Sequence, residues 1–238
     1  MNLVLLEPSD FSGGNGNRVL LTGRRMEHLR RVCRVATGER VRVGLLNGPL
    51  GTATITAIAS DTIEMETALC ESPPPPLSIT LIIAMPRPKS LKKSIETAAS
   101  LGVKKIVVIG SWRVEKSYWS SLVLSEESLS RHLKLGLEQA RDTVLPSIEL
   151  RRRFKPFIED ELPGIVSGIN RRFVAHPYDA RPCPSAIGEP AVLIIGPEGG
   201  FIPYEIARFE ETGFMPVTIG NRILRVETAV AAFIGRLW

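Results

Sequence analysis

Cysteine and histidine are scarce in this chain, with three of each among 238 residues. The cysteines are Cys33, Cys70 and Cys183, an odd number without paired spacing, so neither a disulfide framework nor a zinc knuckle is suggested and free thiols are expected. None of the histidines belongs to a His-x-x-x-His or Cys-x-x-Cys pattern, and we therefore predict no metal site.

Long apolar runs are also missing. The longest, about Leu77 to Met85, is far shorter than the roughly 18 residues that indicate a membrane span. The start, from Met1 to Pro8, lacks the basic residues and apolar core of a signal peptide. The sequence therefore predicts a cytoplasmic protein without a membrane partner.

The usual nucleotide-binding and hydrolase motifs are absent. There is no Gly-x-x-x-x-Gly-Lys-Ser/Thr, no Gly-x-Gly-x-x-Gly after a strand and no Gly-x-Ser-x-Gly. The cluster Gly13-Gly14-Asn15-Gly16 is predicted to be a flexible loop, because no helical pattern follows it. Nucleotide hydrolysis and dinucleotide redox chemistry thus lose their usual support.

Positive charge is concentrated near the N-terminus. The chain has 30 Lys+Arg and 25 Asp+Glu, a net charge of +5. Eight of these arginines fall between positions 18 and 42: Arg18, Arg24, Arg25, Arg30, Arg31, Arg34, Arg40 and Arg42. Arginine suits phosphate and base edges, so this segment is a candidate RNA surface. The alternative is a solvated helix face with flanking strand charges.

A run of four prolines, Pro73 to Pro76, divides the chain, because it can continue neither a helix nor a central strand. We predict an N-terminal domain at 1–72, a linker at 73–77 and a second domain at 78–238. The first domain has the patterns of a small β-barrel with one helix over 24–35. Its predicted strands are 2–6, 18–21, 41–46, 51–58 and 62–67, with a turn at Asn47-Gly48.

After the prolines, strands alternate with helix-length segments, which favours an α/β fold with a mainly parallel sheet covered on both faces. The predicted strands are 78–84, 105–109, 172–175, 191–195 and 215–219. The predicted helices are 90–101, 125–140, 203–212 and 226–238.

Three strand ends have the composition of a binding site. The strand ending at Ile195 runs into Gly196-Pro197-Glu198-Gly199-Gly200, and the one ending at Ile219 runs into Gly220 and the apolar pair Ile223-Leu224. Ligands bind beyond the carboxyl ends of parallel strands, and glycines let the backbone approach them closely. A plain turn and core packing are the alternatives. His176 follows a third strand, where a structural role is the alternative.

These segments resemble the signature of the E-type 16S ribosomal RNA uridine-N3 methyltransferases of the SPOUT superfamily. The similarity is carried by Gly196-Pro197-Glu198-Gly199-Gly200-Phe201, followed by Ile219-Gly220-Asn221-Arg222-Ile223-Leu224-Arg225-Val226-Glu227-Thr228-Ala229. It extends to His28-Leu29-Arg30-Arg31-Val32-Cys33-Arg34, to Ala98 to Val103 and to Glu138-Gln139-Ala140-Arg141.

The resemblance implies S-adenosylmethionine as cofactor, small-subunit ribosomal RNA or the 30S subunit as partner, and a homodimer. It further implies a PUA-like N-terminal barrel and a trefoil knot in the C-terminal sheet. The implied cofactor site is Ala175, His176, Pro177, Ile195, Gly196, Pro197, Glu198, Gly199, Gly200, Ile219, Gly220, Ile223, Leu224, Arg225 and Thr228. The RNA-binding candidates are Arg24, Arg25, His28, Arg30, Arg31 and Arg34.

Some positions depart from the family pattern. Thr97 and Ser100 stand where members usually carry Lys and Glu, and Trp112-Arg113-Val114 replaces a Glu-Arg-Ser-like element. Ile202 replaces the usual Ser/Thr helix cap before Pro203. We carry no role onto these positions.

The implied reaction requires uridine N3 to lose its proton, and Arg225 is the candidate for stabilising the anion. A structural bond is its alternative. Glu227 is the second catalytic candidate, either accepting the proton or orienting Arg225. Two other functions stay open: a related enzyme acting on another RNA, and a non-catalytic RNA-binding or ribosome-assembly protein.

Overall fold

The computed structural model describes residues 2–12 and 16–238, and the predicted glycine loop at 13–16 lies mostly outside them. The chain divides into two compact units. The first contains the residues up to Pro75 together with Lys134–Leu145, and the second contains Pro76–Leu133 and Pro146–Trp238. In the described part of the chain, no helix is long and apolar enough to cross a membrane. The three cysteines are free, as expected.

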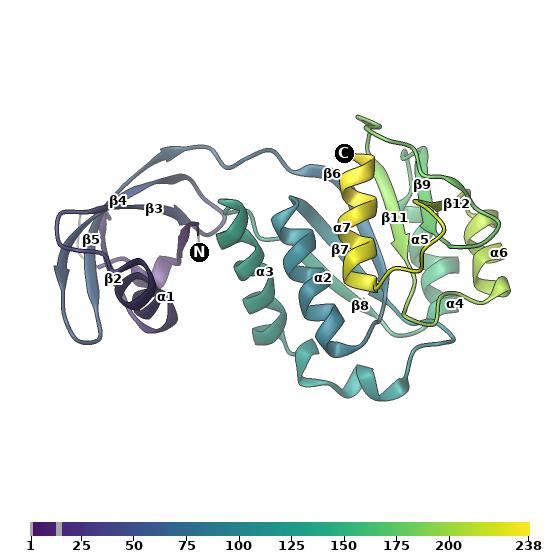
Figure 1. The fold of residues 1–238 in the computed structure, drawn as a ribbon, viewed down its shortest axis with the longest axis horizontal. Helices are drawn as coiled ribbons and strands as arrows, with labels where there is room; N and C mark the ends of the chain where they lie inside the picture. Colours follow the sequence, from purple (N-terminus) through teal and green to yellow (C-terminus); the bar gives the residue numbers. More distant parts are fainter. Residues whose placement is uncertain (1, 13–15) are drawn as a thin grey trace. The chain divides into compact units, whose positions relative to one another are not determined.

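The first unit is built on a curled five-stranded sheet in the order β1-β3-β4-β5-β2 (Figure 1). The strands are β1 (Val4–Leu6), β2 (Arg18–Leu21), β3 (Arg40–Leu45), β4 (Leu50–Ile58) and β5 (Ile63–Glu71). Strand β1 pairs with β3 in parallel, and the other pairs are antiparallel. Alternate residues such as Val19, Leu21, Ile63 and Met65 enter the core, which is why these apolar/polar patterns form strands.

The arginine-rich helix differs from its prediction. A single helix over 24–35 was expected from the three-residue spacing of Met26, Leu29 and Val32. In the structure this segment is α1 (Gly23–His28), which continues as the π-helical turn η2 (Leu29–Cys33). A separate 3₁₀ helix, η1 (Pro8–Asp10), lies earlier in the chain, between β1 and β2. The wider π turn rotates later residues around the axis, so Met26 and Leu29 are buried while Val32 is 67% exposed.

Residues 134–145 join the first unit, although the sequence places them beyond the prolines. They are the C-terminal half of α3 (Glu126–Ala140) and the five residues after it, and Leu137 packs with Leu3, Leu5 and Leu50. The backbone N–H of Asn47 donates to Thr143 O at 2.8 Å, and the Asn47 side chain accepts from Leu145 N at 2.9 Å. Asn47 has a positive φ of 58°, in line with the predicted turn.

The second unit has a seven-stranded, all-parallel sheet in the order β10-β12-β9-β11-β6-β7-β8. The strands are β6 (Leu77–Ala84), β7 (Val103–Ile109), β8 (Ser147–Arg151), β9 (Arg171–Ala175), β10 (Arg181–Pro182), β11 (Ala191–Ile195) and β12 (Met215–Thr218). The prediction of a parallel α/β sheet is confirmed. Strands β8 and β10, on the two edges, were not predicted.

Helices cover both faces of this sheet (Figure 1). On one face, α2 (Pro88–Ser100) and α7 (Val226–Leu237) pack together. The other face carries α4 (Phe154–Pro156), η5 (Phe157–Glu161), α5 (Leu162–Ile165) and α6 (Pro203–Glu211). Two 3₁₀ turns, η3 (Lys116–Ser120) and η4 (Leu122–Leu124), follow β7. All five residues of β11 are buried because helices cover both of its faces.

Candidate functional site

A cavity of about 730 Å³ opens where β9, β11 and β12 end. Because these strands are adjacent and parallel, their carboxyl ends meet at one edge of the sheet. The wall includes these predicted residues: Ala175, His176, Pro177, Ile195, Gly196, Pro197, Glu198, Gly199, Gly200, Ile219, Gly220, Ile223 and Leu224. The three segments that the sequence singled out are therefore brought together.

The loop after β11 is held in a tight turn. Gly200 N donates to Pro197 O at 2.8 Å, and Gly200 has a φ of +69°, which favours glycine. The Glu198 carboxylate accepts from Arg87 N at 3.0 Å, and Arg113 Nη1 donates to Gly199 O at 2.5 Å. These contacts fix a loop of backbone groups at the cavity wall.

The loop after β12 supplies the apolar wall. Gly220 has a φ of +142°, and the Thr218 hydroxyl donates to Gly220 O at 2.9 Å. Ile223, 67% exposed, and Leu224 follow it and line the cavity. Core packing, the alternative interpretation of Ile223, does not fit this exposure.

The start of α7 lies beside the cavity. Arg225 is its N-cap residue, and Glu227 and Thr228 belong to its first turn; none of the three is among the lining residues. Arg225 is exposed, and its carbonyl accepts from Ala229 N at 2.8 Å. A cation at a helix N-terminus opposes the helix dipole, so Arg225 is poorly placed to stabilise α7.

Glu227 is held as a carboxylate. A backbone hydrogen bond within Glu227 lowers its pKa, and Ser90, Lys93 and Arg225 add to this effect while burial opposes it. Its Oε1 lies 4.0 Å from Lys93 Nζ, whereas Oε2 is buried without a hydrogen-bond partner in the described part of the chain. Oε2 of Glu227 is thus available to accept a hydrogen bond, while the lowered pKa makes Glu227 a weaker proton acceptor than an ordinary carboxylate.

Several lining residues were not predicted as site residues, among them Arg113, Tyr178, Asp179, Glu210 and Phe233. Arg113 follows β7, Glu210 lies on α6 and Phe233 on α7. Of these five, only Tyr178 and Asp179 lie within three residues of a predicted residue, His176. In the described residues, no group of three or more potential metal ligands gathers.

His176 lines the cavity and donates its backbone N–H to Val217 O at 3.0 Å. Burial lowers its pKa below the ordinary 6.5, against the opposing effects of Asp179 and Glu210. Just below pH 6.5 the His176 side chain is therefore protonated more fully in the unfolded chain than in the folded protein. The free energy of unfolding should decrease as the pH falls through this region.

We expect the urea midpoint of the second unit to fall between pH 7.5 and pH 5.5, and to fall less in His176→Gln. Tryptophan fluorescence is the measurement, because Trp112, Trp119 and Trp238 all lie in the second unit. His28→Gln is the control, since the pKa of His28 is also lowered by burial but this residue belongs to the first unit. An unchanged pH dependence in His176→Gln would contradict the prediction.

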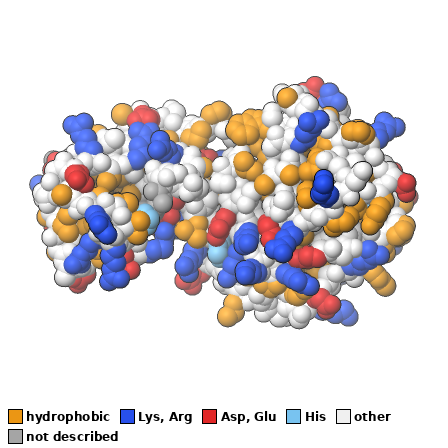
Figure 2. Space-filling model, viewed as in Figure 1, with side chains coloured by type: hydrophobic (Ala, Val, Ile, Leu, Met, Phe, Trp, Pro, Cys, Tyr) orange, Lys and Arg blue, Asp and Glu red, His pale blue; other side chains and the backbone are white. Residues whose placement is uncertain are grey.

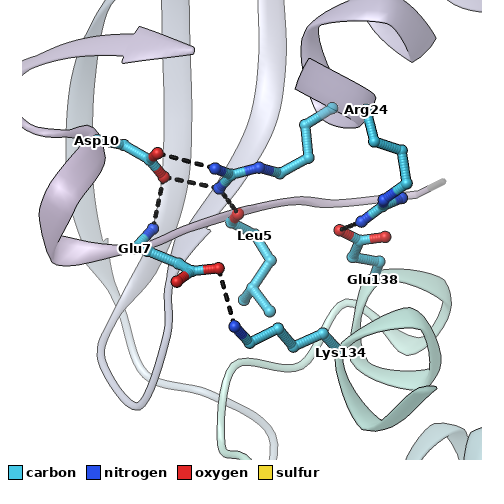
Figure 3. A network of polar contacts seen from close by, with 7 residues as sticks. Leu5, Glu7, Asp10, Arg24, Lys134 and Glu138 are labelled. Carbon is cyan, nitrogen blue, oxygen red and sulfur yellow. Dashed lines mark hydrogen bonds and ion pairs between the residues drawn. The ribbon is translucent and has the colours of Figure 1, made fainter. Parts of the chain in front are cut away.

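Part of the arginine cluster is engaged in ion pairs within the first unit (Figure 3). The Arg25 guanidinium donates to both Asp10 oxygens, at 2.6 and 2.8 Å, and to Leu5 O at 2.6 Å. Arg24 Nη2 donates to Glu138 Oε1 at 2.6 Å, and Lys134 Nζ donates to Glu7 Oε1 at 2.9 Å. Arg25 therefore has a structural role in this network.

The remaining arginines of α1 and η2 are exposed. Arg30 donates to Ser60 O, and Arg31 Nη2 lies 3.8 Å from Glu27 Oε1, a weak surface pair. Arg34 ends η2 with a positive φ of 55°. Burial and nearby Arg24 favour the neutral form of His28 by lowering its pKa. Figure 2 shows Lys and Arg side chains over one face of the first unit. Within the predicted set, Arg30, Arg31 and Arg34 are exposed and take no part in the ion pairs with Asp10 and Glu138.

Comparison with known proteins gives a consistent family. A family model described as RNA methyltransferase domain matches residues 73–238. The ribosomal RNA small subunit methyltransferase E of Treponema pallidum is 28% identical over an alignment of 244 positions, gaps included, that covers 98% of this chain and 88% of that protein. The Borreliella burgdorferi methyltransferase E 1 is 26% identical over 235 residues, covering 98% of this chain and 95% of that protein.

Solved structures share the fold. The ribosomal RNA small subunit methyltransferase E from Neisseria gonorrhoeae, bound to S-adenosyl methionine, superposes with a TM-score of 0.74 at 23% identity. The match covers 98% of this chain and 95% of that one. With the family model spanning most of its length, this chain belongs to the RNA methyltransferase family.

Proposed function

We propose that this protein transfers a methyl group from S-adenosylmethionine to N3 of a uridine in small-subunit ribosomal RNA. The observation that carries the proposal is the cavity between the loops after β9, β11 and β12, in a chain of the RNA methyltransferase family. The names of the relatives support the small ribosomal subunit as target. Transfer to N3 is the finer step, taken from the resemblance in the sequence.

The cavity has the properties that this cofactor requires. Its volume falls within the range of small-molecule sites, which is roughly 300–1,000 Å³. Ile195, Ile223 and Leu224 offer apolar surface for a flat adenine, and the loop at Gly196–Gly200 offers backbone groups. The carboxylates of Asp179 and Glu210 suit a cationic ligand with hydroxyl and amino groups. When bound, the cofactor supplies an electrophilic methyl group.

The protein's part in the reaction is to hold the base in line and to manage its proton. The exposed Arg225 guanidinium can stabilise negative charge on the uridine as N3 is deprotonated. The Glu227 carboxylate, two residues further, can hold Arg225 in place or, against its lowered pKa, take that proton. Because N3 lies on the Watson-Crick edge, the uridine must leave its base pair and stack first.

The test is product analysis. Purified protein, labelled S-adenosylmethionine and unmodified small ribosomal subunits are incubated, and the RNA is digested and analysed by mass spectrometry. We expect N3-methyluridine. A 2′-O-methylated nucleoside, or label only in transfer RNA when that RNA is incubated separately, would favour a different methyltransferase specificity. Cofactor binding without label in any RNA would support a non-catalytic RNA-binding protein.

Arg225→Ala should lower kcat about 100- to 1,000-fold while leaving S-adenosylmethionine affinity unchanged, because the side chain acts on charge that develops in the reaction. Its backbone alone forms the helix cap, so α7 should stay folded. Single-turnover kinetics and calorimetry measure the two quantities, and Arg225→Lys, which keeps the charge, should retain part of the rate. Equal turnover by Arg225→Ala and the unaltered protein would remove Arg225 from the mechanism.

The first unit should bind the RNA through its exposed arginines. Charge reversal of Arg30, Arg31 and Arg34 together should weaken RNA binding roughly 10- to 100-fold at low salt and flatten its salt dependence, because fewer counterions are released. Filter binding measures this, and cofactor binding should be unaffected. Arg171→Glu, an exposed arginine at the start of β9 and outside this segment, is a control for charge reversal at a single site. RNA affinity that survives the triple reversal would place the RNA surface elsewhere.

The trefoil knot and the homodimer remain predictions. Support for the knot comes from the segment between β9 and β11, which lies against the end of α7. Ala186 N donates to Arg236 O at 3.1 Å, and Ile187 N donates to Leu237 O at 2.9 Å. We propose that this segment closes the knot over α7. Sedimentation equilibrium would test the dimer.

A further inference from the structure

The turn after β7 carries an exposed tryptophan that the folding of the second unit does not require. Val114 N donates to Ser111 O at 3.1 Å and closes a turn with Trp112 and Arg113 at its tip. Trp112 is 80% exposed. A large aromatic side chain left in water gains no burial energy, so packing does not explain Trp112.

The backbone at Trp112 is fixed. Its N–H donates to Glu205 Oε1 at 2.8 Å, and the Ser111 hydroxyl lies 3.4 Å from Glu205 Oε2. Glu205, at the start of α6, is only 2% exposed. Trp112 is thus an exposed side chain on an anchored backbone, which lowers the entropy lost when it binds a partner.

The same turn reaches the proposed cofactor cavity through the next residue. Arg113 lines the cavity and donates to Gly199 O at 2.5 Å. Its side chain lies across Gly199, where an added Cβ would be 3.1 Å from Arg113 Cδ. Trp112 is therefore the sequence neighbour of a lining residue, although it does not itself line the cavity.

Exposed basic residues lie at the next strand end. Gly110 N donates to Arg151 O at 2.8 Å, which places the ends of β7 and β8 side by side. Arg152 and Arg153 follow and are exposed, and the Arg152 guanidinium lies 5.8 Å from the Trp119 ring centroid. Aromatic faces beside positive charge are the combination that binds unstacked bases and their phosphates.

We propose that Trp112 is a stacking platform for an unstacked base of the RNA substrate at the mouth of the cavity, with Arg152 and Arg153 contacting the adjoining phosphates. The inference rests on the proposed function, because an RNA methyltransferase acting at N3 must hold its uridine outside the helix. Trp112 is a feature of this chain, because members of the family that the sequence resembles carry a Glu-Arg-Ser-like element where this chain has Trp112-Arg113-Val114.

The test compares Trp112→Ala, Trp112→Phe and Trp238→Ala in the full-length protein. Trp238 is the matched control: it is 71% exposed and lies at the other end of the 12-residue α7, about 18 Å from the cavity-side end. Small-subunit ribosomal RNA is the probe. We expect Trp112→Ala to weaken RNA binding roughly 5- to 100-fold, Trp112→Phe to retain most of the affinity, and Trp238→Ala to bind normally.

Fluorescence gives a direct readout of stacking. RNA should quench tryptophan emission in the unaltered protein and in Trp238→Ala, and most of that quenching should disappear in Trp112→Phe. S-adenosylmethionine affinity by calorimetry should be equal in all variants. Unchanged RNA affinity in Trp112→Ala, unchanged quenching in Trp112→Phe, or a loss of cofactor binding would overturn the proposal. So would a change of oligomeric state in Trp112→Ala, which would assign Trp112 to contact with a second copy.

The two proposals fail separately. RNA binding and quenching that depend on Trp112, in a protein that methylates no ribosomal RNA, would refute the proposed function and keep the stacking platform. If small-subunit RNA is methylated, and RNA binding and quenching do not depend on Trp112, the proposed function stands and the stacking platform is refuted.

Discussion

Gly199→Val should reduce S-adenosylmethionine binding by at least about 100-fold without unfolding the protein. A Cβ on Gly199 would lie 3.1 Å from Arg113 Cδ and 3.2 Å from Arg113 Cβ, closer than ordinary contact. The branched side chain must displace Arg113 and with it the hydrogen bond to Gly199 O. The loop would then lose the backbone geometry that lines the cavity. Arg113 is exposed and can move outward, so the fold should survive.

Calorimetry measures the binding, and circular dichroism with urea unfolding checks the fold. Gly164→Val is the matched control, because Gly164 on α5 is exposed and nothing lies within 4 Å of an added Cβ. Gly199→Ala should fall between the two. Cofactor binding of ordinary strength in Gly199→Val would mean that the loop at Gly196–Gly200 is not the cofactor site.

The spacing of apolar residues in the sequence predicts those helices and strands that are buried on one face or on both. The wholly buried β11 and the amphipathic α2 and α6 lie close to where their patterns place them. Strand β8 was not predicted. Nearly all of its residues are half-buried, so exposed and buried positions do not alternate along it. The membership of residues 134–145 in the first unit depends on Leu137 meeting Leu3 and Leu50, a long-range contact that local pattern does not encode.

The candidate site likewise contains residues that the sequence predicts and residues that it does not. Strand ends rich in glycine are visible in the sequence, because the chemistry of a close backbone approach selects glycine locally. Glu210 lies on α6, between the two loops, but Arg113 reaches the cavity from the turn after β7, which is distant from them in the chain. The pairing of Arg25 with Asp10 was equally hidden, because an arginine on a predicted helix face carries no mark of its partner.

Glu205→Ala should lower the free energy of unfolding of the second unit by about 2 to 4 kcal/mol. Ile202 has no side-chain oxygen to cap α6, and instead the Glu205 carboxylate accepts from Ile202 N at 3.0 Å, half of a capping box. The other carboxylate oxygen accepts from Trp112 N. Alanine leaves both N–H groups without this partner and opens a space where Glu205 was buried, and each unsatisfied group costs about 1 to 3 kcal/mol.

Urea unfolding followed by tryptophan fluorescence isolates this effect, because no tryptophan lies in the first unit. Glu205→Gln keeps the size and one acceptor oxygen, so its loss should be about half as large. Asp160→Ala, at an exposed carboxylate on η5, should change stability by less than about 0.5 kcal/mol. If Glu205→Ala unfolds with the same midpoint as Asp160→Ala, the carboxylate does not anchor the turn, and the fixed backbone at Trp112 needs another source.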